Sequence, residues 1–177
     1  HQQLVDSLTE SLTDPVVGLL MGETAEIVAE QWNITREEQD EFAYQSHRKA
    51  IQARDRGFFQ KEIVPVTKQL RNETVTIDRD EGPKSSVSKE QLSLLKPVFK
   101  KGGSVTAGNA CGLNDGAGAI LLADEKSVKE HELKAKAKIR SVAFVGLEPE
   151  RMGLGPAYAV PEALRKAGLS LDDVDVI

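Results

Sequence analysis

The stretch Ser104–Gly118, SVTAGNACGLNDGAG, marks the point at which the character of the chain changes. It holds four glycines and two asparagines and leads into the small apolar run Ala117–Ala123. Glycine and asparagine favour turns, and a short apolar run beside turn residues is typical of a buried strand. We therefore place a domain boundary here, with residues 1–103 on one side and residues 104–177 on the other.

Predicted helices and strands alternate after this boundary. The run at 117–123 is followed by a helix, a strand, a helix and a strand, over Glu125–Leu133, Ile139–Gly146, Pro156–Ala167 and Asp173–Ile177. Gly168 follows the second helix and suits its C-terminal end. Such alternation is typical of an α/β fold with a helix-covered parallel sheet. The last strand reads as cut short and the first residue is not methionine, so we interpret the sequence as part of a longer protein.

The region before the boundary is predicted to be helical and rich in loops. Residues 23–32 form a helical pattern, and Thr35-Arg36-Glu37-Glu38 is a capping box that should start a long helix ending near Arg56. Gly57 suits the position just after that helix. The expected apolar faces of the two helices consist of Ala25, Val28, Ala29 and Trp32 on the first, and Phe42, Ala43, Ser46, Ala50 and Ala53 on the second.

Two strands and a short helix are expected next. Residues 60–66 and 73–78 read as strands, and Pro65 would make the first one an edge strand or an interrupted one. Ser88, with Gln91 three residues later, should cap a short helix that ends before Pro97.

Composition narrows the classes of function. The chain of 177 residues is 40% hydrophobic and 29% charged, which suits one or two globular domains. The net charge of −5 includes no basic stripe, so nucleic acid is not an expected partner. No apolar run is long enough to cross a membrane, and no membrane partner is expected. The three histidines lie far apart at His1, His47 and His131, and with a single cysteine they predict no metal site.

Cys111, the only cysteine, has two interpretations. Its glycine-rich surroundings could bring backbone amides close to a bound group, which would favour a nucleophile. No histidine base lies near it in sequence, however, so a small residue in a tight loop is the other interpretation. Three further motifs have plain structural interpretations: the S-x-x-K match Ser86–Lys89 as a capped helix, Gly153–Pro156 as a turn, and Lys100-Lys101 as a solvated pair.

Five segments resemble the thiolase family, which includes acetyl-CoA acetyltransferases and 3-ketoacyl-CoA thiolases. They are GSVTAGNACGLNDGAGAILL, LMGETAEIVAEQWNITREEQDEFAYQSHRKA, EIVPV, LKPVFKKGGSVTAGN and MGLGPAYAVPEALRKAGLSLDDVDVI. They follow the order and spacing of the family over nearly all of the chain. The resemblance implies a thiolase-like α/β fold, with a helix-covered mixed sheet and an inserted loop domain. Residues 1–103 would then be the loop domain with the end of the first core half, and residues 104–177 the truncated start of the second half.

The resemblance also implies a chemistry. Thiolases cleave a 3-ketoacyl-CoA with free CoA through an acyl-cysteine intermediate, giving acetyl-CoA and a shortened acyl-CoA, or run the condensation in reverse. The nucleophilic cysteine of the family would lie before His1, and its histidine and second cysteine after Ile177. No catalytic residue is therefore expected in this chain, and alone it is expected to be inactive. The family uses CoA and acyl-CoA as substrates, and no cofactor is implied.

Eight positions match the CoA groove of the family: Leu20, Met21, Lys84, Gln91, Phe99, Ala107, Cys111 and Met152. Cys111 stands where thiolases commonly have a serine facing the pantetheine arm, so the resemblance makes it a substrate contact. Lys84 stands where an arginine often meets the adenine or phosphate end, and keeps its charge but not its planar fork. Leu20 replaces a frequent histidine, and Gln91 replaces a frequent serine.

Two other functions stay open at this point. One is a non-catalytic CoA-binding or oligomerisation module, and the other is a cysteine hydrolase that uses Cys111. The resemblance implies a homodimer or homotetramer for the full-length protein and is compatible with a cytoplasmic location. Open strand edges in an unfinished sheet predict association or partial disorder of the isolated chain.

Overall fold

The computed structural model describes residues 4–177, which form two compact units that divide between Gly112 and Leu113. The division lies within the glycine-rich stretch, later in the chain than the boundary that we drew between residues 103 and 104. No helix within the described residues is long and apolar enough to cross a membrane.

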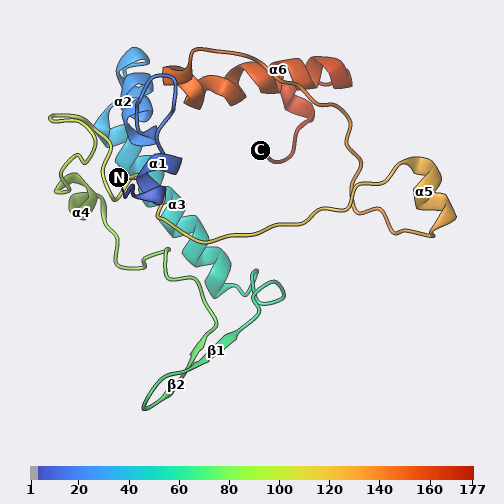
Figure 1. The fold of residues 1–177 in the computed structure, drawn as a ribbon, viewed down its shortest axis with the longest axis horizontal. Helices are drawn as coiled ribbons and strands as arrows, with labels where there is room; N and C mark the ends of the chain where they lie inside the picture. The colour runs from blue at the N-terminus through green and yellow to red at the C-terminus, as the bar shows by residue number, and fades with distance from the viewer. Residues whose placement is uncertain (1–3) are drawn as a thin grey trace. The chain divides into compact units, whose positions relative to one another are not determined.

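Four helices belong to the first unit: α1 (Ser7–Ser11), α2 (Met21–Gln31), α3 (Arg36–Asp55) and α4 (Lys89–Ser93) (Figure 1). The two predicted capping boxes are confirmed. At the start of α3, Thr35 Oγ1 accepts the Glu38 amide at 3.2 Å and Glu38 Oε2 accepts the Thr35 amide at 2.8 Å. Ser88 and Gln91 make the same exchange before α4, at 3.2 Å in both directions. Gly57 follows α3 with a φ of +77°, which is unstrained only for glycine.

A two-stranded hairpin extends beyond the C-terminal end of α3 (Figure 1). β1 (Val66–Gln69) pairs antiparallel with β2 (Thr74–Ile77), and Val66 faces Ile77. The second predicted strand is confirmed, but the first was placed too early. The Ile63 amide donates to the Phe59 carbonyl at 3.0 Å, so the chain is still in a turn before Pro65. This hairpin is the only sheet within residues 4–177.

The small core of the first unit contains three buried apolar side chains and four buried polar ones. Its buried residues are Ala29, Leu92 and Val105, together with Thr24, Glu26, Asp40 and Thr106. The predicted apolar faces are therefore partly wrong: Ala25 is exposed, Trp32 is 58% exposed and Phe42 is 80% exposed. The two helices instead bury Glu26 and Asp40, because these carboxylates bind the loop described below.

The second unit contains short helices joined by long unpaired segments (Figure 1). The elements are α5 (Glu125–Glu130), the 3-10 helix η1 (Pro149–Leu154), α6 (Gly155–Ala167) and the 3-10 helix η2 (Leu171–Asp173). Both predicted helices are confirmed. Gly168 ends α6 in the left-handed conformation, with a φ of +68°, as predicted.

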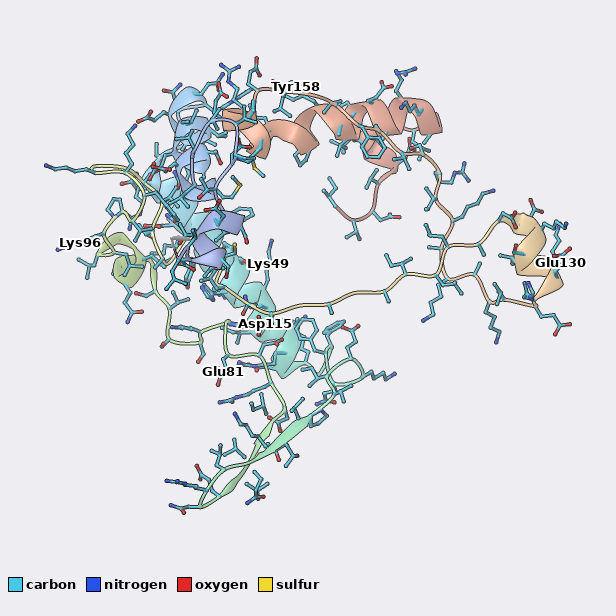
Figure 2. All side chains as sticks on the ribbon, in the orientation of Figure 1. Lys49, Glu81, Lys96, Asp115, Glu130 and Tyr158 are labelled. Atoms are coloured by element: carbon cyan, nitrogen blue, oxygen red, sulfur yellow. The ribbon has the colours of Figure 1, made fainter. Side chains whose placement is uncertain are left out.

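The three strands predicted for the second unit are not formed. Residues 117–123, 139–146 and 173–177 have no ladder partner among the described residues. Ile120 is 87% exposed where a buried strand was expected, and Figure 2 shows the labelled Asp115 on a long trace drawn without helix or strand. The physical reason is that a strand exists only through hydrogen bonds to a neighbour, and no segment of residues 4–177 supplies one.

Candidate functional site

The Ser104–Cys111 loop is fixed to α2 by one buried carboxylate. Glu26 is 3% exposed, and its Oε1 accepts the Val105 amide at 2.8 Å and the Ser104 amide at 2.9 Å. Its Oε2 accepts the Ser104 hydroxyl at 3.0 Å. Burial raises the pKa of Glu26, but the hydrogen bonds from Val105 and Ser104 outweigh burial and hold the pKa below its usual value. The carboxylate is therefore ionised and satisfied at neutral pH.

A second buried carboxylate, Asp40 on α3, holds the other end of the same loop. Asp40 accepts Arg36 Nε at 2.8 Å and Asn109 Nδ2 at 3.0 Å. Asn109 also accepts the Thr106 amide at 2.7 Å and donates to the Ser104 carbonyl at 3.0 Å, which closes the loop on itself. The loop is thus bound to two helices by ionised groups.

Arg36 extends this network to the segment after α4. Its Nη2 donates to the Leu92 carbonyl at 2.6 Å and to the Leu95 carbonyl at 3.0 Å. Leu92 lies in the last turn of α4, and Leu95 follows the C-cap of that helix. One guanidinium therefore joins α3, α4 and, through Asp40, the Ser104–Cys111 loop.

Two glycines, Gly103 and Gly108, let the backbone in and beside the Ser104–Cys111 loop lie close to neighbouring side chains. A Cβ added at Gly108 would lie 2.5 Å from Leu95 Cδ1 and 2.6 Å from Leu92 Cδ2. A Cβ added at Gly103 would overlap the Glu26 carboxylate. Both glycines thus let the backbone approach its neighbours more closely than a side chain would allow.

Ala107 and Cys111 of this loop are exposed to solvent, while Val105 and Thr106 of the same loop are buried. Both predicted contacts are therefore accessible to a ligand. His47, the histidine of this unit with a described side chain, binds the Lys84 amide instead of the Cys111 thiol. Among residues 4–112, no histidine base accompanies Cys111.

Lys84 lines a hollow of about 520 Å³ beside the hairpin. The side chains that line it include the cationic residues Arg54, Arg79 and Lys84, the hydroxyls of Ser85 and Ser86, and the carboxylates of Asp78, Asp80 and Glu81. Figure 2 marks Glu81 on the loop that follows β2. Cations and hydroxyls suit an anionic group, and the three carboxylates balance the three cations, so the lining has no formal net charge.

The structure places the other predicted contacts at separate positions. Leu20 and Met21 are half-buried at the start of α2, and the Phe99 ring covers Gly22 next to them. Gln91 is exposed, with its Oε1 used by the capping box of α4. Met152 is 50% exposed in η1 and belongs to the second unit.

Sequence reasoning missed the residues that hold the loop: Glu26, Arg36, Asp40 and Asn109. A signal was available, because Glu26 sits between apolar neighbours in the α2 pattern and Arg36 and Asp40 form an i, i+4 pair. Residues 4–177 contain no cluster of His, Cys, Asp and Glu side chains that would hold a metal.

Comparison with known proteins identifies the class. The family model "Thiolase, N-terminal domain" matches residues 1–126, and "Thiolase, C-terminal domain" matches residues 133–177. The chain belongs to the thiolase family, and the resemblance noted in the sequence is confirmed.

Individual relatives are similar along most of the chain. The β-ketoadipyl-CoA thiolase of Acinetobacter baylyi is 52% identical over 89% of this chain and 39% of its own. The crystal structure of the Bacillus anthracis acetyl-CoA acetyltransferase has a TM-score of 0.89 and 45% identity, over 99% of this chain and 45% of its own. Human mitochondrial 3-ketoacyl-CoA thiolase in complex with CoA has a TM-score of 0.85 and 45% identity, over 97% of this chain and 42% of its own. The thiolase-like α/β fold class is confirmed, and the chain spans less than half the length of these relatives.

Proposed function

We propose that this chain carries part of the CoA-binding surface of an acyl-CoA acyltransferase. The reaction is the cleavage of a 3-ketoacyl-CoA by free CoA, or the reverse condensation of two acetyl-CoA. Membership of the thiolase family supports the reaction class, and one relative is described in complex with CoA. The residues of this chain bind and orient the substrate, and the proposal assigns none of them as the nucleophile.

The observation that carries the proposal is the hydrogen-bonded Ser104–Cys111 loop. Glu26 on α2 accepts hydrogen bonds from its backbone amides and Asp40 on α3 accepts one from the Asn109 side chain, while Ala107 and Cys111 stay accessible. A loop that is rigid before binding loses little conformational entropy when a ligand contacts it. The loop therefore suits a fixed contact with the pantetheine arm, at Ala107 and at Cys111.

Other predicted contacts take roles that fit their surroundings. Lys84, in a hollow with Arg54 and Arg79, would meet the anionic end of CoA. Met21 and Phe99 would offer apolar surface to the ligand, with Leu20 beside them. Gln91 retains its side-chain NH₂ group as a donor, and Met152 is a proposed contact from the second unit.

The proposed function also includes the substrates, the oligomeric state and the cellular location. CoA and acyl-CoA are substrates, and no further cofactor is proposed. We propose a homodimer or homotetramer for the full-length protein. The relatives include human mitochondrial and bacterial proteins, and a cytoplasmic location remains a prediction.

Calorimetric titration of the 177-residue chain with CoA tests the binding surface. We expect saturable binding, and Lys84→Gln should raise the Kd about three- to tenfold by removing a charge beside the ligand. Lys49→Gln is the matched control, since Lys49 is an exposed lysine of α3 that does not line the hollow, and it should leave the Kd unchanged. Absence of CoA binding, or equal effects of the two variants, would contradict the assignment.

Thiolysis of acetoacetyl-CoA with free CoA tests the assignment of Cys111. The chain should bind CoA without turning the substrate over. Turnover that Cys111→Ser abolishes would show that Cys111 is a nucleophile and would favour the cysteine-enzyme interpretation.

A further inference from the structure

Lys84 is fixed by a side chain from a distant part of the sequence. His47, in the middle of α3, accepts the Lys84 backbone amide on Nδ1 at 3.2 Å. A backbone amide only donates, so Nδ1 is the acceptor in this hydrogen bond. The hydrogen bond connects positions 37 residues apart.

The backbone of Lys84 is held on its other side as well. Its carbonyl accepts the Val87 amide at 3.4 Å. Both peptide groups of Lys84 therefore have a partner, and the Lys84 side chain starts from a defined backbone position. Fixing a binding group before the ligand arrives increases affinity, because less freedom is lost on binding.

α3 supplies both this anchor and part of the hollow. Arg54, which lines the hollow together with Lys84, lies seven residues after His47 on α3. Positions seven apart on a helix are about two turns along the same face. One face of α3 thus carries a cation of the hollow and the acceptor that ties Lys84 to it.

We propose that His47 is a positioning residue for CoA binding, which acts by holding the backbone of Lys84 so that its ammonium group meets the anionic end of the ligand. This inference rests on the proposed function. His47 itself does not touch the ligand, and its contribution depends on the presence of the lysine.

Two substitutions of His47, of similar size, differ in whether they supply an acceptor for the amide. In asparagine, Oδ1 occupies the same place along the side chain as Nδ1 of histidine, so His47→Asn keeps an acceptor for the amide. In leucine, a methyl group occupies that place and accepts nothing. His131→Leu is the matched control, since His131 is an exposed histidine of the second unit.

The first measurement is the CoA affinity of the 177-residue chain by calorimetry. His47→Leu should raise the Kd about two- to fivefold, which corresponds to the loss of one hydrogen bond. His47→Asn and His131→Leu should bind as the wild-type chain does. In a Lys84→Gln background, His47→Leu should not raise the Kd further, because His47 acts through the lysine. A purely structural role of His47 would raise the Kd even without the lysine.

The second measurement is independent of CoA and follows tryptic cleavage after Lys84. His47→Leu should speed this cleavage about two- to fivefold by releasing the backbone, while His47→Asn should not. The inference is overturned if His47→Leu leaves the CoA affinity unchanged, or lowers it equally with and without Lys84. Lack of CoA binding by the wild-type chain overturns the proposed function and the inference with it. The tryptic result, in contrast, reports only whether the hydrogen bond from His47 holds the Lys84 backbone.

Discussion

The two units of the chain differ in how their segments are held together. In the first unit, Glu26 and Asp40 are buried and bind a loop about 70 or more residues later. In the second, no residue from 113 to 177 is buried, and hydrogen bonds between distant segments include those from Ser141 to the Ala163 carbonyl at 2.6 Å and from Lys166 to the Val142 carbonyl at 3.2 Å. The first unit completes its polar contacts internally, while the second leaves apolar side chains in solvent.

The difference between the units reflects how many partners each kind of contact requires. A carboxylate needs only a few nearby donors, and the Ser104–Cys111 loop supplies them. A strand needs a neighbouring strand along its whole length. The matched relatives are more than twice as long as the segment they share with this chain. Since the buried side chains of residues 4–177 all lie in the first unit, this unit should carry most of the stability of the isolated chain.

The largest expected effect is at the apolar centre of the first unit. Leu92 is 3% exposed and Leu94, on the same segment, is 82% exposed. Leu92→Ala should lower the free energy of unfolding by about 2–4 kcal/mol, since it leaves a cavity. Leu94→Ala should change it by less than about 0.5 kcal/mol. Urea unfolding measures both, and equal effects would show that the first unit lacks the core described.

The next effect is at the carboxylate that binds the loop. Glu26→Gln should lower the free energy of unfolding by about 1–3 kcal/mol, because the new NH₂ group faces the Ser104 and Val105 amides, which are also donors. Glu30→Gln is the control, since Glu30 is an exposed glutamate of α2 that pairs with Lys100. A smaller loss for Glu26 than for Glu30 would count against the loop anchor.

The same carboxylate predicts a pH dependence. The pKa of folded Glu26 lies below its ordinary value of 4.5, so its contribution to stability is fully present above the unfolded pKa. The contribution is lost as the pH falls through the folded pKa. Unfolding free energies between about pH 3 and pH 7 should therefore fall less steeply for Glu26→Gln than for the wild-type chain. The remaining carboxylates are common to the two proteins, so the comparison isolates Glu26. Parallel curves would contradict the prediction.

The smallest effect on stability is expected in the second unit. Ile120 is 87% exposed, so Ile120→Ser should change the unfolding free energy by less than about 0.5 kcal/mol. It should nevertheless reduce self-association seen by light scattering, because an exposed apolar strand segment favours pairing between chains. A large loss of stability would mean that the segment is packed.

Local signals in the sequence were sufficient for much of the fold. The capping boxes at Thr35 and Ser88 start helices as predicted, and Gly57 and Gly168 follow helix ends as predicted, because these effects involve a few adjacent residues. The strands of the second unit were wrong, since apolar composition shows where a strand is suited but not whether a partner is present.

The candidate site was predicted only through the resemblance to thiolases. Ala107 and Cys111 are accessible on one loop, but the roles of Glu26 and Asp40 depend on contacts between segments distant in sequence. Neither spacing nor composition specifies such contacts, and the His47–Lys84 hydrogen bond is of the same kind.

The most direct test of the CoA surface uses Cys111, which is exposed and is the only cysteine of the chain. Its alkylation by iodoacetamide would be followed by mass spectrometry at increasing acetyl-CoA, which has no free thiol to consume the reagent. The account predicts that acetyl-CoA slows the labelling to a saturating limit, and that Lys84→Gln shifts saturation to higher concentration. A labelling rate that acetyl-CoA does not change, at concentrations that saturate binding by calorimetry, would contradict the placement of Cys111 beside the ligand.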